Sequence, residues 1–118
     1  MPEVILPTTA TEWSFACWFN LTNNTYNKAT CFFSERTAAN SNGYTIFLYP
    51  DSSKMLVDCG GRWTITPQTF TAGLWYHLVV TRNPSGLKIY VDGALKAQTS
   101  TVYTPTAINS NGCLIGLA

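Results

Sequence analysis

The sequence predicts an all-β domain, and two observations carry that prediction. Short apolar runs alternate along the whole chain with turn-forming Thr, Asn, Gly and Pro, while helix signals are nearly absent. A chain of 118 residues suits one domain, and a domain of that size buries roughly two thirds of its unfolded surface. We therefore predict a single domain over residues 1–118, with residues 1–12 as an extended amino-terminal arm.

The strands follow one another along the chain. In residues 13–20, WSFACWFN, apolar side chains take every second position, which is the period of a strand. Pro50, which cannot donate to a sheet ladder, ends a later strand, and Gly60-Gly61 indicates a turn or a bulge. Further strands are predicted over residues 29–36, 44–50, 55–59 and 62–66, and from weaker signals over 94–99 and 112–118.

The clearest signal is a hairpin over residues 73–93, GLWYHLVVTRNPSGLKIYVDG. A turn at Asn83-Pro84-Ser85-Gly86 fixes which residues face each other, because the side-chain period of a strand is two. The core face then holds the pairs Arg82 with Leu87, Val80 with Ile89 and Leu78 with Val91, together with Tyr76.

The other face of this hairpin is half apolar. It pairs Thr81 with Lys88, Val79 with Tyr90 and His77 with Asp92, and Trp75 lies beyond. A sheet face open to water usually carries more charge, and a half-apolar face with aromatic rings marks a contact surface. We predict that a loop, another subunit or a ligand covers this face.

The hairpin closely resembles the central hairpin of concanavalin A-like domains of the laminin-G/pentraxin type. The stretch 12–19, EWSFACWF, is similar to an early strand of that family, and 43–48, GYTIFL, to the strand after it. These pieces occur in the family's order over residues 12–93. The resemblance implies an antiparallel two-sheet β-sandwich, a jelly roll, used for binding carbohydrate or protein.

The chain departs from that family at both ends. The first and last strands of the family have no counterpart here, although residues 112–118, GCLIGLA, resemble a remnant of the strand before the last. Open sheet edges have unpaired backbone N–H and C=O groups that can pair with another chain. The cysteine that pairs with the Cys17 position in pentraxins is replaced by Val79, and the segments that hold the family's calcium are not matched. We therefore predict no metal site and no cofactor.

Catalytic residue patterns are missing. Glycoside hydrolases need two carboxyl groups close together, and glucanases of this fold carry Glu-x-Asp-x-x-Glu. None of the six acidic residues here is two or four positions from another. His77 with Asp92 resembles two members of a triad, but no serine or cysteine lies near His77 in the sequence and no Gly-x-Ser-x-Gly is present. We expect His77 to be structural and the protein not to be an enzyme.

Composition excludes several partners. The net charge is +1, only 11% of residues are charged and no basic stripe occurs, which argues against nucleic-acid binding. No apolar run approaches a membrane span of roughly 20 residues, and the start MPEVILPTTATEW lacks the features of a secretion signal. The four cysteines are widely spaced, which argues against zinc, and we expect them to be reduced and in the core.

Aromatic residues are the best candidates for contacts, because Tyr and Trp rings stack on sugars and anchor protein interfaces. We expect Trp63, which follows Arg62 and the double glycine, to be the exposed tryptophan, whereas Trp13, Trp18 and Trp75 are expected in the core or an interface. Arg62 and Asp58 are expected in water or at a ligand. Tyr49, Tyr90 and Tyr103 could join Trp63, or these rings could pack between the sheets.

Two functions follow from these observations. The first is a non-catalytic, self-associating module on a virion, such as a phage capsid decoration or tail-associated protein, with a homo-oligomer, a trimer first, and other virion proteins as partners. The alternative is a carbohydrate-binding, lectin-like module of a larger secreted or cell-surface protein, with surface glycans as partners. A groove lined by Trp63, Arg62 and tyrosines favours the glycan. A flat apolar face around Trp75, Val79 and Tyr90 buried by another subunit favours assembly.

Overall fold

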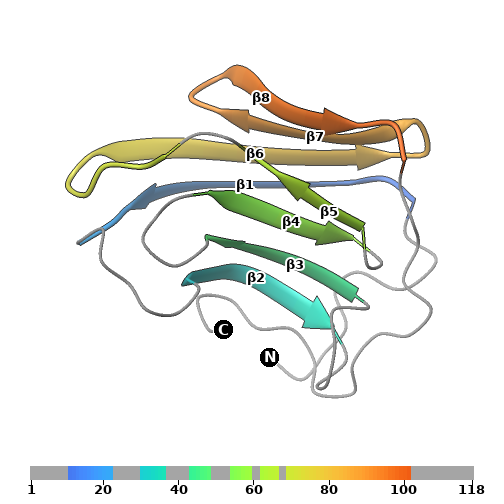
Figure 1. Ribbon diagram of the computed structural model, residues 1–118, viewed down its shortest axis with the longest axis horizontal. Coiled ribbons are helices and arrows are strands. Elements are labelled where there is room, and N and C mark those ends of the chain that lie inside the picture. The colour runs from blue at the N-terminus through green and yellow to red at the C-terminus, as the bar shows by residue number, and fades with distance from the viewer. Residues whose placement is uncertain are drawn as a thin grey trace.

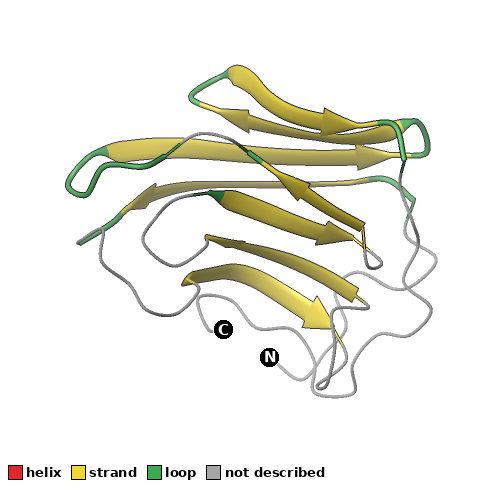
Figure 2. Cartoon of the chain, in the orientation of Figure 1, coloured by secondary structure: helices red, strands yellow, loops and turns green. Residues whose placement is uncertain are grey.

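A computed structural model of the chain describes residues 11–22, 30–36, 43–48, 54–59, 62–66 and 69–101. The described residues contain strands and connecting turns but no helix, so no helix there could cross a membrane (Figure 2). The eight strands are β1 (Trp13–Asn20), β2 (Thr30–Arg36), β3 (Gly43–Leu48), β4 (Met55–Cys59), β5 (Arg62–Ile65), β6 (Trp75–Asn83), β7 (Gly86–Val91) and β8 (Ala94–Thr99).

These strands form two antiparallel sheets of four. Sheet A has the order β1-β6-β7-β8, and sheet B has the order β2-β3-β4-β5 (Figure 1). Sheet B is a meander in which each strand pairs with the next along the chain. In sheet A, β1 pairs with β6, which brings together segments more than fifty residues apart. The predicted all-β, two-sheet antiparallel sandwich is confirmed.

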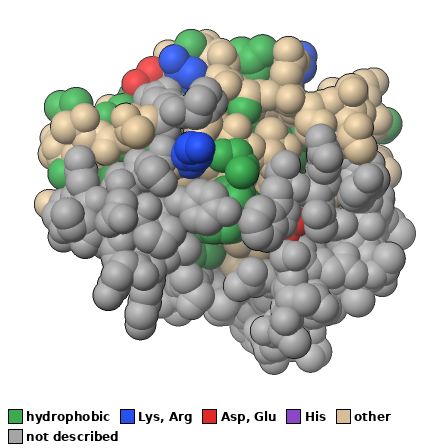
Figure 3. Space-filling model, viewed as in Figure 1, with side chains coloured by type: hydrophobic (Ala, Val, Ile, Leu, Met, Phe, Trp, Pro, Cys, Tyr) green, Lys and Arg blue, Asp and Glu red, His purple; other side chains and the backbone are tan. Residues whose placement is uncertain are grey.

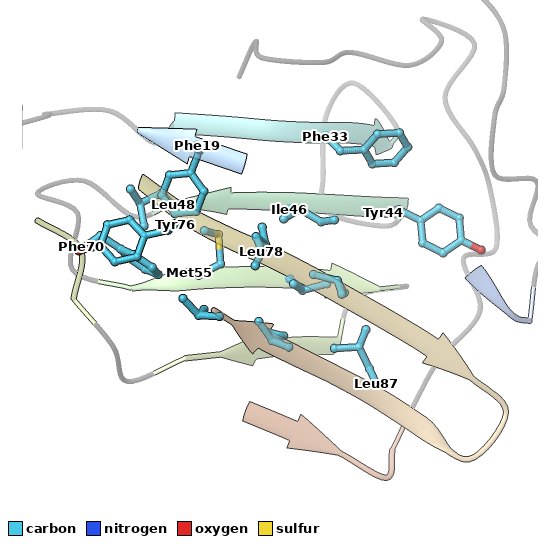
Figure 4. Packing of buried hydrophobic residues seen from close by; sticks show 14 of the residues in the cluster. Phe19, Phe33, Tyr44, Ile46, Leu48, Met55, Phe70, Tyr76, Leu78 and Leu87 are labelled. Atoms are coloured by element: carbon cyan, nitrogen blue, oxygen red, sulfur yellow. The ribbon is translucent and has the colours of Figure 1, made fainter. Parts of the chain in front are cut away.

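The hydrophobic core lies between the sheets. Strands β6 and β7 bury every second side chain, as the period of two requires (Figure 4). Strand β4 is buried on both faces. The largest fully buried side chains are Tyr44, Phe70, Ile46, Leu48, Met55, Leu56, Leu78, Leu87, Ile89, Val57 and Val80.

One end of the core is a cluster of aromatic rings. The ring of Phe19 lies 5.0 Å from Phe32 and 5.4 Å from both Phe70 and Tyr76, measured between ring centroids. Phe70 meets Tyr76 edge-on at 4.9 Å, and the Tyr76 hydroxyl accepts a hydrogen bond of 2.8 Å from the backbone N–H of Thr71. This cluster packs β1 and the start of β6 against the segment before β6.

A buried arginine lies toward the other end of the core. Arg82 is 4% exposed, and its Nη1 donates to the carbonyl oxygen of Thr11. The Cys59 side chain of sheet B is hydrogen-bonded to Arg82. A buried charge is stable only when it has such partners, so Arg82 links the sheets to the chain that enters β1.

The predicted hairpin register is confirmed: five of the six predicted pairs, including Val80 with Ile89 and Thr81 with Lys88, are strand pairs of β6 and β7. Residues 94–99, a weaker prediction, form the complete strand β8. The strand predicted over 44–50 is described over Gly43–Leu48 and that over 29–36 over Thr30–Arg36; residues 29, 49 and 50 lie outside the described part of the chain. The predicted strand 112–118, the Gly60-Gly61 turn and most of the arm 1–12 lie outside the described residues.

The cysteines that the structure describes are Cys17, which is half-buried, and Cys31 and Cys59, which are buried. No disulfide joins any two of these three. Burial raises the pKa of the Cys17 thiol above its ordinary 9.0. Burial also raises the pKa of Cys59, while neighbouring Arg82 acts in the opposite direction. Cys113 lies outside the described part of the chain.

Candidate functional site: the aromatic face of sheet A

The outer face of sheet A carries exposed aromatic side chains. In β1 the outward positions include Trp18, and in β6 they include Trp75, and each of these side chains is 66% exposed. In the β1–β6 register Trp18 is opposite His77 and Trp75 is opposite Asn20. The two tryptophans are therefore diagonal neighbours on adjacent strands, with backbones about 7–8 Å apart.

The His77 ring supports Trp18. The two ring centroids are 4.7 Å apart and their planes are inclined by 42°. Because opposite residues of antiparallel strands point to the same side, the pairing of β1 with β6 produces this contact. The imidazole thereby restricts the orientation of an indole that is otherwise largely in water.

The predicted pairing of His77 with Asp92 is made through the backbone. Asp92 Oδ1 accepts a 2.9 Å hydrogen bond from the His77 backbone N–H, and the Asp92 N–H donates to the His77 carbonyl oxygen at 2.9 Å. Asp92 and Gly93 have φ of 52° and 81°, as a two-residue type I′ hairpin turn requires. The carboxylate therefore holds the β7–β8 turn against β6, and no His–Asp catalytic pair is formed.

The middle of this face is apolar. Val79 and Tyr90 are half-buried and opposite each other on β6 and β7, and Leu95 of β8 is opposite Tyr90 and 45% exposed. We use the name aromatic face for the set Trp18, Trp75, His77, Val79, Tyr90 and Leu95. Four of these residues, Trp75, His77, Val79 and Tyr90, are those that the sequence places on the contact face, and the structure brings them together.

Trp18 and Trp75 are both expected in the core or an interface, and their exposure excludes the core and leaves the interface as a prediction. Trp13 is only partly exposed and packs edge-on against Tyr44 with ring centroids 5.7 Å apart. The signal was present in the strand period. In WSFACWFN, Trp18 shares its face with Ser14, Ala16 and Asn20, whereas Trp13 shares the core face.

The remaining predicted contact residues do not join this face among the residues described. Arg62 and Trp63 lie in β5 of sheet B, at register positions opposite Cys59 and Asp58, and only their backbones are described. Asp58, expected in water or at a ligand, is 1% exposed. Tyr49 and Tyr103 lie outside the described residues.

Metal ligands and strong charge are not gathered on the described surface. No group of three or more His, Cys, Asp or Glu side chains that could hold a metal occurs in the described ranges. On the face shown in Figure 3, the coloured basic and acidic side chains form no patch of one sign. The rings of the aromatic face are suited to stacking, and its Trp, Tyr and His side chains also carry hydrogen-bonding groups.

Two antiparallel sheets packed face to face, with exposed aromatic side chains on one outer face, define an antiparallel β-sandwich. The chain belongs to the concanavalin A-like lectin/glucanases superfamily, because the family model Laminin_G_3 matches residues 2–118. The resemblance drawn from the hairpin and the early strands is thus confirmed. No curated protein matches the sequence.

Two solved structures are similar to the chain. One is assigned as a candidate carbohydrate-binding protein from Bacteroides ovatus, with a TM-score of 0.63 and 16% identity, over 83% of this chain and 29% of that one. The other is the carbohydrate-binding module CBM66 from Bacillus subtilis, with a TM-score of 0.57 and 14% identity, over 81% of this chain and 63% of that one. At these identities the likeness shows the jelly-roll fold, and this chain spans less than two thirds of either structure. Neither structure nor the family model supports the predicted virion role.

Proposed function

We propose that this protein is a non-catalytic carbohydrate-binding module and that the aromatic face of sheet A binds the sugar. The observation that carries the proposal is that Trp18 and Trp75, diagonal neighbours on one sheet face, are each 66% exposed. An indole offers a wide apolar plate with one N–H donor at its edge, which matches the apolar C–H face and the polar rim of a sugar ring.

Polar groups at both ends of the aromatic face suit a sugar better than a purely apolar partner. Asn20 is opposite Trp75, and Thr81 continues the β6 face beyond Val79. Amide and hydroxyl groups both donate and accept hydrogen bonds, as the hydroxyls of a sugar require. A ligand site that combines apolar area with a few directed polar groups is the usual form of a small-molecule site.

The likeness to two carbohydrate-binding structures supports the same choice over assembly on a virion. Many polysaccharides lie outside cells or at their surfaces, so this proposal implies an extracellular or surface location for the module. Self-association through the aromatic face, with a trimer first, stays a prediction from the sequence. The experiment below separates it from sugar binding.

The test is affinity gel electrophoresis of the purified protein against a panel of neutral and acidic polysaccharides. Trp18→Ala and Trp75→Ala are compared with Ile65→Ala, which removes a 40% exposed side chain from sheet B. Loss of a buried aromatic anchor from an interface costs on the order of 2 kcal/mol, or about thirtyfold in Kd. We expect each tryptophan variant to lose about that much affinity and Ile65→Ala to bind as the wild type does.

Three results would overturn the proposal. The first is unchanged retardation of both tryptophan variants, and the second is no retardation of the wild type by any polysaccharide. The third comes from light scattering at several concentrations. If the wild type forms an oligomer that Trp75→Ala dissociates, the aromatic face is a subunit interface.

A further inference from the structure

A polar groove lies at the end of sheet A that is far from Trp18 and Trp75. It has a volume of about 440 Å³ and lies between the β6–β7 turn and the end of β8. Its lining is formed by Thr81, Asn83, Ser85, Gly86, Lys88, Gln98, Thr99 and Ser100. Gly86 allows β7 to approach β8 there, because a Cβ at this position would collide with the carbonyl oxygen of Thr99.

The groove continues the aromatic face. Thr81, Lys88 and Gln98 form one row across β6, β7 and β8, and this row is next to the row that contains Val79 and Tyr90 on the same side of the sheet. Trp75 and Thr81 are six positions apart on β6. At 3.3–3.4 Å per residue the two ends are about 20 Å apart, so one extended ligand must span several sugar units to reach both.

Several polar groups of the groove are already engaged locally. Asn83 Oδ1 accepts a 2.8 Å hydrogen bond from the Ser85 N–H, and Thr99 Oγ1 accepts one of 3.1 Å from the Thr101 N–H. Lys88 is the charged residue of the lining, and its ammonium makes no ion pair with any acidic side chain that the structure describes. The groove thus presents one cation among neutral hydroxyls and amides.

We propose that the groove is a second subsite for an acidic sugar unit, with Lys88 as the residue that recognises its anionic group. This inference rests on the proposed function and names the ligand class: an extended acidic polysaccharide whose rings stack on Trp18 and Trp75. The anionic group is a carboxylate or a sulfate ester. A hydrogen bond between an ammonium and an anion is roughly twice as strong as a neutral one, and the hydroxyls and amides around Lys88 complete the recognition of the ring.

The experiment measures Kd by titration calorimetry for matched pairs of polysaccharides. Polygalacturonate and alginate are compared with their carboxyl-reduced forms, and chondroitin sulfate is compared with its desulfated form. The variant is Lys88→Gln, and Lys96→Gln is the control, because Lys96 is an exposed lysine of β8 outside the groove lining. Trp75→Ala is measured in parallel.

We expect an acidic polymer to bind about tenfold or more tightly than its neutral form, and Lys88→Gln to remove that preference while Lys96→Gln keeps it. A preference within the polygalacturonate or alginate pairs indicates recognition of a carboxylate, and one within the chondroitin sulfate pair indicates recognition of a sulfate ester. If acidic and neutral forms bind equally and binding still depends on Trp75, the acidic subsite is wrong and the proposed function stands. A preference for acid that survives Lys88→Gln also overturns the subsite. Binding of no polymer by the wild type overturns both.

Discussion

The Asp92 carboxylate gives a sharp test of how the aromatic face is built. In the structure it accepts a hydrogen bond of 2.9 Å from the His77 backbone N–H and occupies a left-handed position at φ 52°. Asp92→Ala removes this hydrogen bond and places at a type I′ turn position a residue that rarely adopts the left-handed backbone conformation. Asp92→Asn keeps an oxygen acceptor and the tolerance of Asn for this conformation.

The magnitude follows from these two losses. The hydrogen bond is exposed to solvent, so it contributes about 1 kcal/mol, below the range for charged acceptors in buried sites. Placing Ala in the left-handed backbone conformation of position 92 costs about 1 kcal/mol more. Asp92→Ala is therefore expected to lower the free energy of unfolding by about 2 kcal/mol. His77→Ala keeps the backbone bond and loses only the partly exposed contact with Trp18, which is expected to cost about 0.5 kcal/mol.

Thermal unfolding followed by circular dichroism measures the effect. At roughly 4 °C per kcal/mol for a domain of this size, Asp92→Ala lowers Tm by about 8 °C, and Asp92→Asn and His77→Ala by about 2 °C each. The double variant of His77 and Asp92 completes a cycle. If Asp92→Ala and His77→Ala cost the same and the double variant costs no more, the carboxylate acts on the imidazole and the backbone account is refuted.

Three further predictions concern the core and the groove. Leu78→Ala removes a side chain that is 0% exposed at the centre of sheet A, and is expected to cost about 3 kcal/mol in urea unfolding; a loss below 1 kcal/mol would contradict the packing described. Gly86→Ala forces β7 away from Thr99, which is expected to lower the free energy of unfolding by about 1–3 kcal/mol and to weaken binding of acidic polysaccharide. A variant with the stability and the binding of the wild type would argue against the close approach of β7 and β8. Because the pKa values of Cys17 and Cys59 are raised, the folded state holds these thiol protons more tightly than the unfolded state does. The contribution of these two thiols to the free energy of unfolding is therefore constant below about pH 8 and falls as pH rises through 9.0 toward the folded pKa values. Urea titrations under reducing conditions between pH 7 and 10 check this, and Cys17→Ala should make the decline shallower.

The β6–β7 hairpin was predictable in full because a turn with strong sequence signals fixes the register and a period of two then assigns each face. The same period places Trp18 on the outward face of β1 with Ser14 and Ala16, in agreement with its exposure. Strand β8 gave a weak signal for a physical reason. Most of its side chains are exposed, so it has little apolar alternation for the sequence to display.

The contacts of Arg82 and Asp92 were beyond sequence reasoning. Arg82 was placed in the core row correctly, yet its partners come from Thr11, 71 positions away, and from Cys59 in the other sheet. The facing of His77 and Asp92 was predicted, but the acceptance of the His77 backbone N–H by the carboxylate depends on the conformation of the β7–β8 turn. The polar groove likewise forms only where the end of β8 returns to the β6–β7 turn.

The most direct test of the central claim is a nuclear magnetic resonance titration of the four tryptophan indole N–H signals, assigned by single Trp→Phe variants. The titrant is the polysaccharide that retards the protein most. We predict that the signals of Trp18 and Trp75 shift on binding, while that of Trp13, which packs against Tyr44, stays in place. Binding that leaves the Trp18 and Trp75 signals unmoved would contradict a sugar site on the aromatic face of sheet A.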